Sequence, residues 1–468
     1  MIYFFIKFDI IIKSGNMKII IAGIGKLGEY LAKKLSEDGN DVVIIDEKPI
    51  NKRDIVNNED VFYINGNALD STTLIESGIG NSDLLISVMD KDEKNIMCSF
   101  LGKKLGVKRT IARVRTPEYA SSVNILKEDL GLSMTINPEF MTASHIARIL
   151  SIPNALDTVS FFKGRTLMIS LKIKDSSTIA GVSLTSLAKK LKKKVIVCAI
   201  ERNGETIIPK GNHKIEVGDK IHITGTRDHI LSFLRFANLV GEKNKKIIIS
   251  GGSTTCVYLA QMLIESGMDV KIVELNEERC KVLSEQLPDA LIINGDASNQ
   301  DILYEEGIEQ CDSFIALTSL DEENIIHSMF AKSINVPNVI TKVNHINLDG
   351  ILEKADVDTV VTPHKIACNQ IVRYVRAMKN SNNSSCESIY KFDEEKFEMI
   401  EFYVKHGFKG LNTKLKDLKI GDNILVAAIL RGRNIIFPTG EDEIKEKDTI
   451  VIAATEDKNI EDINDILE

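Results

Sequence analysis

A glycine-rich turn near the N-terminus contains the residues whose types and spacing most directly predict chemistry. Three glycines with the spacing G-x-G-x-x-G follow the apolar run KIIIA, which is typical of a strand, and open a helical pattern. The first glycine permits a tight turn, the second lets a pyrophosphate approach the backbone, and the third lets the helix pack closely on the sheet. The helix N-terminus would then offer N–H groups and a positive dipole end to phosphate. The predicted site contains Gly23, Ile24, Gly25, Lys26, Leu27 and Gly28.

An acidic residue stands where such a turn requires a partner for a ribose. Asp46 ends the next apolar run, DVVIID, at about the spacing of 20 residues expected of a dinucleotide fold. Its carboxylate would accept hydrogen bonds from ribose hydroxyls and repel a 2′-phosphate, which favours NAD(H) or an adenine nucleotide over NADP(H). Lys26 adds either a phosphate contact or an ordinary solvated charge. The alternative for the whole turn is a role in packing alone.

Other chemistries find no support in the sequence. Gly28 is followed by Glu29, where a phosphate-binding loop of the Walker type needs Lys and then Ser or Thr, so ATP hydrolysis is not predicted. The eight histidines form no motif, and the seven cysteines include no C-x-x-C pair, which indicates reduced thiols and no metal site. Asp92, Glu93 and Asp321 are expected at helix starts, where capping is the ordinary explanation. We therefore predict no catalytic residue.

Two arginines follow a later strand of the same predicted sheet. Arg113 and Arg115 lie in ARVRTPEY, near the carboxyl end of a strand, where open α/β sheets bind their ligands. One of them either contacts phosphate or forms an ion pair with a nearby acid. Arg113 is included in the predicted nucleotide site.

The chain repeats itself once. KIIIAGIGKLGEYLAKKL from Lys18 matches KIIISGGSTTCVYLAQML from Lys246, an offset of 228 residues, and later pairs such as Asp219 and Asp448 lie 229 residues apart. The second copy has Ser253 in place of Gly25 and Cys256 in place of Gly28. We expect the serine to hinder phosphate and the cysteine to loosen the packing of the helix. A structural lobe, or one that binds a smaller nucleotide, is favoured there.

Glu274 is the doubtful ribose acceptor of the second copy. It matches Asp46 at the offset of 228 residues and ends the run DVKIVE. We retain it in the predicted site with that reservation.

Each copy combines two kinds of structure. Its first half alternates short apolar runs with helical patterns, which predicts an α/β fold with a Rossmann-like, doubly wound parallel sheet. Its second half contains β-branched runs and the hairpin signal Asn203-Gly204, which predicts a small β-rich α+β module. A helix between the halves either docks a neighbouring lobe or packs ordinarily. The predicted domains are an extension at 1–16, a first Rossmann-like domain at 17–137, a crossover helix at 138–155, a first C-terminal module at 156–238, a second Rossmann-like domain at 244–362, a crossover helix at 363–382 and a second C-terminal module at 385–468.

The composition sets broad limits. The 468 residues are 43% hydrophobic, and the formal net charge of −8 argues against nucleic acid as the main partner. The segment MIYFFIKFDIIIKSGN is too short to cross a bilayer and is interrupted by Lys7 and Asp9, so we expect translation to start at Met17. Any membrane role is expected to come through a partner.

Taken together, these motifs resemble the TrkA family of Trk system potassium uptake proteins, which carry tandem regulator-of-K⁺-conductance (RCK) domains. The resemblance rests on KIIIAGIGKLG, DVVIID, NGNA, DEKNIM and ARVRTPEY in the first copy, and on NGDAS and ALTSLDEENII in the second. It adds Asn67 and Ala68 of NGNA to the predicted site. It implies NAD(H) and/or ATP/ADP as a regulatory ligand, and a non-enzymatic, cytoplasmic homo-oligomer that is peripheral on the inner face of the plasma membrane.

The resemblance further implies a ring of lobes that gates an integral-membrane potassium transporter subunit of the TrkH/TrkG type. Two other functions would use the same glycine turn. One is an NAD-dependent oxidoreductase, which would need a substrate lobe with an acid–base residue. The other is a regulatory subunit of a different cation transporter or antiporter.

Overall fold

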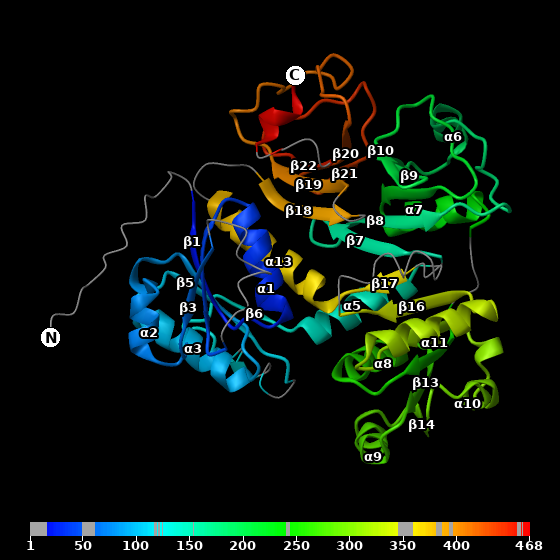
Figure 1. The fold of residues 1–468 in the computed structure, drawn as a ribbon. Coiled ribbons are helices and arrows are strands. Elements are labelled where there is room, and N and C mark those ends of the chain that lie inside the picture. The colour runs from blue at the N-terminus through cyan, green and yellow to red at the C-terminus, as the bar shows by residue number, and fades with distance from the viewer. Residues whose placement is uncertain are drawn as a thin grey trace. The chain divides into compact units, whose positions relative to one another are not determined.

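The computed structural model describes residues 16–48, 61–116, 119, 122–123, 125–152, 154–239, 244–344, 359–380, 386–392, 396–455, 460 and 462–468 (Figure 1). The predicted extension at 1–16 therefore lies almost wholly outside the described residues. The chain forms two compact units, each treated by itself below. The first unit contains residues 1–138 and 364–372, and the second contains residues 139–363 and 373–468.

The first unit is built on a six-stranded parallel sheet with the strand order β3-β2-β1-β4-β5-β6. This confirms the predicted Rossmann-like sheet. The strands are β1 (Lys18–Ala22), β2 (Asp41–Asp46), β3 (Val61–Asn65), β4 (Leu84–Ser87), β5 (Arg109–Arg113) and β6 (Met134–Ile136). The helical segments are α1 (Lys26–Glu37), α2 (Ser71–Glu76), η1 (Ile79–Asn81) and α3 (Asp92–Lys104).

The apolar runs seen in the sequence form the interior of this sheet. Every residue of β4 is buried, as are four of the five residues of β1. Continuous apolar runs suit parallel strands because both faces of such a sheet are covered. Leu27, Leu31 and Leu35 supply the buried stripe of α1 at the spacing of a helix.

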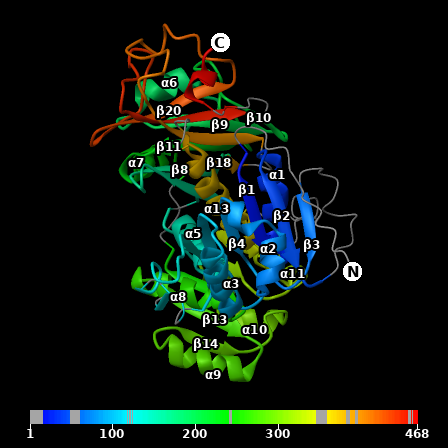
Figure 2. The same cartoon turned by 90° about the vertical axis from the view of Figure 1, so that its left-hand side faces the viewer.

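The second unit repeats the same sheet with the strand order β14-β13-β12-β15-β16-β17, again parallel (Figures 1 and 2). Its strands are β12 (Lys246–Ser250), β13 (Asp269–Glu274), β14 (Leu291–Asn294), β15 (Ser313–Ala316), β16 (Asn338–Lys342) and β17 (Thr359–Val361). Its helical segments are α8 (Thr254–Glu265), α9 (Glu277–Gln286), α10 (Gln300–Glu305), η2 (Ile308–Gln310) and α11 (Asp321–Ser333). The duplication read from the sequence is thus a duplication of structure.

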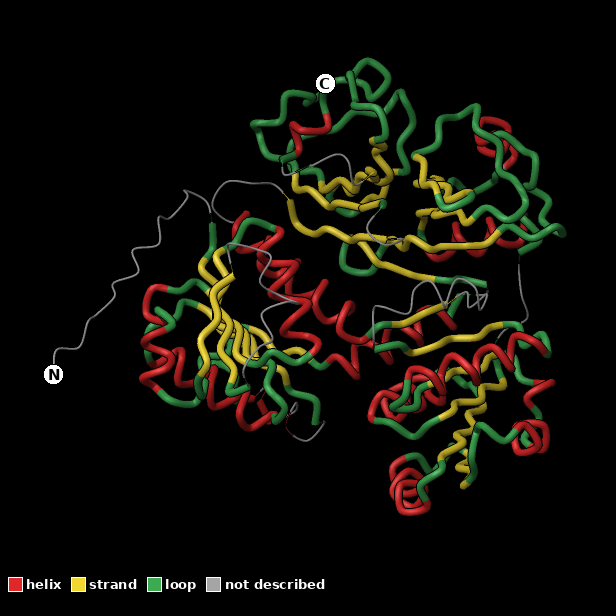
Figure 3. The backbone as a smooth tube through the Cα atoms, in the orientation of Figure 1, coloured by secondary structure: helices red, strands yellow, loops and turns green. Residues whose placement is uncertain are grey.

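Two five-stranded antiparallel sheets form the C-terminal modules (Figure 3). The first contains β7 (Asp157–Phe161), β8 (Thr166–Lys172), β9 (Ile196–Arg202), β10 (Glu205–Ile207) and β11 (Lys220–Gly225), with α6 (Leu184–Lys190) and α7 (Arg227–Phe236). The second contains β18 (Cys386–Phe392), β19 (Phe397–Tyr403), β20 (Ile424–Arg431), β21 (Asn434–Ile436) and β22 (Thr449–Thr455), with η5 (Ile463–Ile466). Asn203 and Gly204 join β9 to β10 with φ angles of 52° and 79°, which confirms the predicted hairpin.

The two long helices between the halves contact different lobes. In the second unit, α5 (Pro138–Leu150) places Phe140 edge-on against Tyr258 of α8, with ring centroids 5.4 Å apart. In the first unit, the start of α13 (Pro363–Asn380) places His364 edge-on against Tyr30 of α1, at 5.5 Å. Each helix therefore contacts the nucleotide-type lobe of the other copy.

The two C-terminal modules share a hydrophobic core within the second unit. Met168 and Ala199 of the first module are buried in one cluster with Phe397 and Ala428 of the second. Two polar contacts accompany this core. His222 Nδ1 lies 2.9 Å from the hydroxyl of Ser170 on the neighbouring strand. The Glu401 carboxylate of the second module accepts a hydrogen bond from the Phe162 N–H of the first, at 3.2 Å.

The described part of the chain contains no helix that is both long enough and apolar enough to span a membrane. The six cysteines whose side chains are described are free thiols, and all are buried.

Candidate functional site

The glycine turn of the first lobe joins β1 to α1 as predicted. Gly23 adopts φ +104°, and a methyl group placed on it would lie 2.8 Å from the Met89 nitrogen. A methyl group on Gly28 would lie 2.0 Å from the Gly23 carbonyl oxygen. Both glycines are therefore required by the protein's own packing.

Gly25 has no such explanation within the protein. Its φ and ψ of −62° and 176° suit any residue, and a methyl group on it would meet no described atom within 4 Å. It is the N-cap residue of α1, and no described side chain caps this helix end. The first N–H groups of a helix lack partners within the helix, so this end can accept an anion that approaches past Gly25.

Asp46 lies at the carboxyl end of β2 and holds the turn in place. One oxygen of its carboxylate accepts a hydrogen bond from the Ile24 N–H at 2.8 Å, and the other accepts one from the Lys48 N–H at 2.8 Å. The side chain is only half-buried, so its remaining lone pairs face the same edge of the sheet. This is the geometry of an acceptor beside a phosphate-binding turn.

The other predicted residues of the turn divide by burial. Lys26 is exposed at the first position of α1, whereas Leu27 is 5% exposed and belongs to the core, so only its backbone can face a ligand. Asn67 is exposed, and its side chain accepts a hydrogen bond from the Leu69 N–H at 2.8 Å. Ala68 is buried in the core of the lobe. The assignment of all these residues to a ligand remains a prediction.

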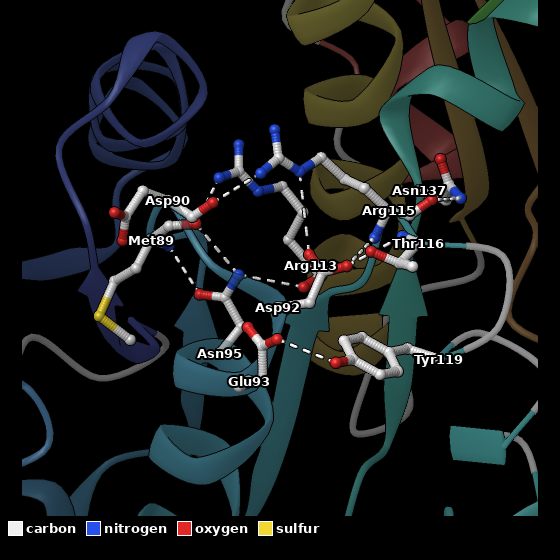
Figure 4. Close-up of polar contacts among 10 residues, drawn as sticks. All are labelled: Met89, Asp90, Asp92, Glu93, Asn95, Arg113, Arg115, Thr116, Tyr119 and Asn137. Atoms are coloured by element: carbon white, nitrogen blue, oxygen red, sulfur yellow. Dashed lines mark hydrogen bonds and ion pairs between the residues drawn. The ribbon is translucent and has the colours of Figure 1, made fainter. Parts of the chain in front are cut away.

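A polar network at the ends of β4 and β5 adjoins the turn (Figure 4). The Arg113 guanidinium donates to the carbonyl of Met89, the residue that Gly23 contacts, and Arg115 Nη2 donates to the Asp90 carbonyl at 2.5 Å. Arg115 also lies 3.8 Å from the Asp92 carboxylate, which is the ion pair considered from the sequence. Arg113 is thus placed beside the glycine turn, although on a backbone carbonyl.

The acids at the helix starts have roles that differ from the expected capping. Asp92 is the first residue of α3, but one of its oxygens accepts hydrogen bonds from the N–H groups of Arg115 and Thr116, both at 2.9 Å. The Glu93 carboxylate accepts a hydrogen bond from the Tyr119 hydroxyl at 3.0 Å (Figure 4). Capping was therefore the wrong explanation, because each carboxylate reaches the segment after β5.

Asn95 is a residue of this network that the sequence did not single out. It is fully buried, and its side-chain oxygen accepts a hydrogen bond from the Met89 N–H at 2.7 Å, while its amide donates to the carbonyls of Met89 and Arg113. Asn324 makes the corresponding contacts with Thr318 and Lys342 in the second lobe. The repeated DEKN and DEEN motifs carried the signal that could have found this pair.

The second lobe keeps part of the site and closes another part. Glu274 accepts hydrogen bonds from the N–H groups of Gly252 and Asn276, at 2.7 and 2.8 Å, which matches the arrangement of Asp46. Ser253 caps α8, because its hydroxyl accepts a hydrogen bond from the Cys256 N–H at 3.4 Å. Cys256 is fully buried, and this burial raises the pKa of its thiol to about 12.

Comparison with protein families settles the relationship. Residues 19–138 and 247–363 match the TrkA-N domain, and residues 168–238 and 399–467 match the TrkA-C domain. The chain belongs to the TrkA family of Trk system potassium uptake proteins.

Curated relatives match over nearly the whole chain. The Trk system potassium uptake protein TrkA homolog of Archaeoglobus fulgidus is 30% identical over 96% of this chain and 100% of its own length. The TrkA protein of Haemophilus influenzae is 28% identical over 97% of this chain and 99% of its own. Family membership makes the chain a component of potassium transport, and these relatives are named as uptake proteins of the Trk system.

Solved structures agree in fold. The crystal structure of the GsuK RCK domain is 16% identical and aligns with a TM-score of 0.62 over 95% of this chain and 93% of that chain. A GsuK channel bound to NAD is 15% identical, with a TM-score of 0.61 over 95% of this chain and 78% of that chain. Both therefore support the tandem RCK architecture.

Proposed function

We propose that the first lobe binds NAD(H) or an adenine nucleotide, and that this binding regulates potassium uptake through a membrane partner without chemical turnover. The observation that carries the proposal is Gly25. It is the one glycine of the turn that the protein's own packing does not require, and it lies at an uncapped helix N-terminus. A ligand phosphate accounts for both features.

The remaining contacts follow from the chemistry of the neighbouring residues. Asp46 accepts hydrogen bonds from ribose hydroxyls and disfavours a 2′-phosphate by charge repulsion. Lys26 is exposed at the same helix end and contributes a positive charge to phosphate. Relatives named as potassium uptake proteins, and an RCK channel described as bound to NAD, favour this reading over an oxidoreductase.

The control of transport requires that the nucleotide favour one arrangement of the protein over another. A ligand shifts such an equilibrium only by its difference in affinity for the two states. Phosphate that binds past Gly25 lies beside Gly23, which contacts Met89, whose carbonyl receives the Arg113 guanidinium. We propose that this chain of contacts carries the difference to the segment after β5. The partner is an integral-membrane potassium transporter subunit of the TrkH/TrkG type, beneath which the lobes of several chains form a ring.

A calorimetric titration with NAD⁺, NADH, ATP and ADP tests the binding step. Gly25→Val should weaken the binding at least tenfold, because a branched side chain fills the space past which the phosphate must approach. Gly407→Val is the matched control, since a methyl group on this exposed glycine also meets no described atom within 4 Å. Equal affinity in the native chain and in Gly25→Val would refute the proposal, and steady NADH oxidation would favour the oxidoreductase.

Potassium uptake by vesicles that contain the transporter and the added protein tests the regulatory step. The nucleotide that binds should change the uptake rate with the native chain and leave it unchanged with Gly25→Val. A nucleotide response that persists in this variant would separate regulation from the glycine turn.

A further inference from the structure

Two basic side chains end at the glycine turn of the second lobe. Arg279 of α9 donates from Nε to the Gly252 carbonyl at 2.7 Å. Lys342 of β16 donates from Nζ to the Leu317 carbonyl at 3.3 Å, and a methyl group on Gly251 would lie 3.0 Å from the Leu317 carbonyl carbon. Both side chains therefore bring positive charge to the turn.

Most of the donors on these two side chains are unused by the described residues. An ammonium group has three N–H donors and a guanidinium has five, whereas each group makes one hydrogen bond to the described part of the chain. Lys342 is only 7% exposed, and burial lowers the pKa of its ammonium group, against the opposing charges of Asp321 and Glu139. A buried cation with spare donors is costly unless an anion completes its partners.

The turn itself has less room for an anion than its counterpart in the first lobe. Ser253 places a side chain where a methyl group on Gly25 would meet nothing, and its hydroxyl already takes the Cys256 N–H. A pyrophosphate therefore loses the close backbone approach that the first lobe offers. A single phosphate group can instead be held by side chains, for which arginine is well suited because its fork of donors matches phosphate oxygens.

We propose that the second lobe binds one phosphate group between Arg279 and Lys342, in the form of a nucleoside monophosphate. Glu274 accepts a hydrogen bond from a ribose hydroxyl, because its carboxylate has the same two backbone N–H partners as Asp46. The two charges of the phosphate monoester match the two cations. This site is independent of the nucleotide site proposed for the first lobe.

Calorimetric titration of the full-length chain with adenosine 5′-monophosphate, inorganic phosphate and adenosine tests the proposal. The monophosphate should bind the native chain and Gly25→Val with affinities equal within about twofold, and adenosine should not bind measurably. Arg279→Gln should weaken the monophosphate about tenfold or more, since it removes charge-assisted hydrogen bonds. Lys281→Gln, on the exposed face of the same helix, is the control and should change the affinity less than twofold.

Three results would overturn the proposal. They are absence of monophosphate binding to the native chain, unchanged affinity in Arg279→Gln, and displacement of the bound monophosphate from the native chain by saturating NAD⁺. The last measurement needs no variant, so a Gly25→Val chain that fails to fold does not block the test. NAD⁺ binding that is lost in Gly25→Val but kept in Arg279→Gln reports on the first lobe alone, which keeps the two proposals distinguishable.

Discussion

The glycines of the first turn meet three different demands. Gly23 is fixed by its φ of +104° and its contact with Met89, Gly28 by its contact with the Gly23 carbonyl, and Gly25 by nothing in the described protein. A fingerprint of three glycines therefore separates into two that fold the lobe and one that faces a ligand.

Replacement of single glycines by alanine should show this separation in thermal unfolding. Gly28→Ala should lower the free energy of unfolding by about 2 kcal/mol or more, because the added methyl group overpacks the turn. Gly25→Ala should change it by less than about 1 kcal/mol, since its backbone angles suit alanine. Nearly equal losses of stability in the two variants would contradict this distinction.

Asp92 provides a second prediction for a single side chain. Its carboxylate is 5% exposed and binds the N–H groups of Arg115 and Thr116. Asp92→Ala should lower the free energy of unfolding by about 1–3 kcal/mol and speed hydrogen exchange at both N–H groups, because their acceptor is lost. Asp90→Ala removes only an exposed ion pair with Lys94 and should have little effect. Unchanged exchange in Asp92→Ala would show that the carboxylate does not hold this segment.

The sequence predicted the turn and Asp46 well because both depend on local spacing. It could not predict that Asp92 and Asn95 join the network, since their partners lie 18–24 residues away and depend on how β4 and β5 align. The placement of Arg113 near the turn was predicted from the parallel sheet, but its bond to the Met89 carbonyl was not.

At the scale of elements, a strand-to-strand ion pair recurs in both C-terminal modules. Arg202 of β9 donates two hydrogen bonds of 2.8 Å to Asp219 in the first module, and Arg431 of β20 does the same to Asp448, at 2.9 and 2.8 Å. Each aspartate also accepts a backbone N–H and is 1% exposed. The pairing of Asp219 with Asp448 was visible in the sequence repeat, but this role was not.

Loss of one such aspartate should destabilise its module. Asp448→Ala should lower the free energy of unfolding by about 2 kcal/mol, less than the 3–5 kcal/mol of a fully buried pair because the arginine is about one-third exposed. Asp422→Ala removes an exposed partner of Lys210 and should cost at most about 1 kcal/mol. Denaturant unfolding followed by circular dichroism compares the variants, and equal midpoints would contradict the prediction.

The whole second unit should lose stability in mild acid. Burial lowers the pKa of His327, which lies between the hydroxyls of Ser250 and Ser298, and it lowers the pKa of His145 beside Asp157. The unfolded chain therefore binds protons first as the pH falls through the ordinary histidine value of 6.5. Stability is then fully present above that pH and decreases below it.

Thermal unfolding between pH 7.5 and pH 5.5 measures this dependence. The midpoint should fall with pH in the native chain and fall less in His327→Gln, whereas the exposed His406→Gln should behave like the native chain. A dependence of equal size in His327→Gln and the native chain would assign the effect to other groups.

The shared core of the two C-terminal modules has a consequence for how the molecule can evolve. In a symmetric dimer of identical chains, every residue at the interface occurs twice, so a buried acid would bring a second buried acid with it. Here His222 pairs with Ser170 on one side, while Val451 and Glu401 occupy the matching strand positions on the other. Fusion of the two copies has released the interface from twofold symmetry, so one carboxylate is buried where a homodimer would have to accommodate two.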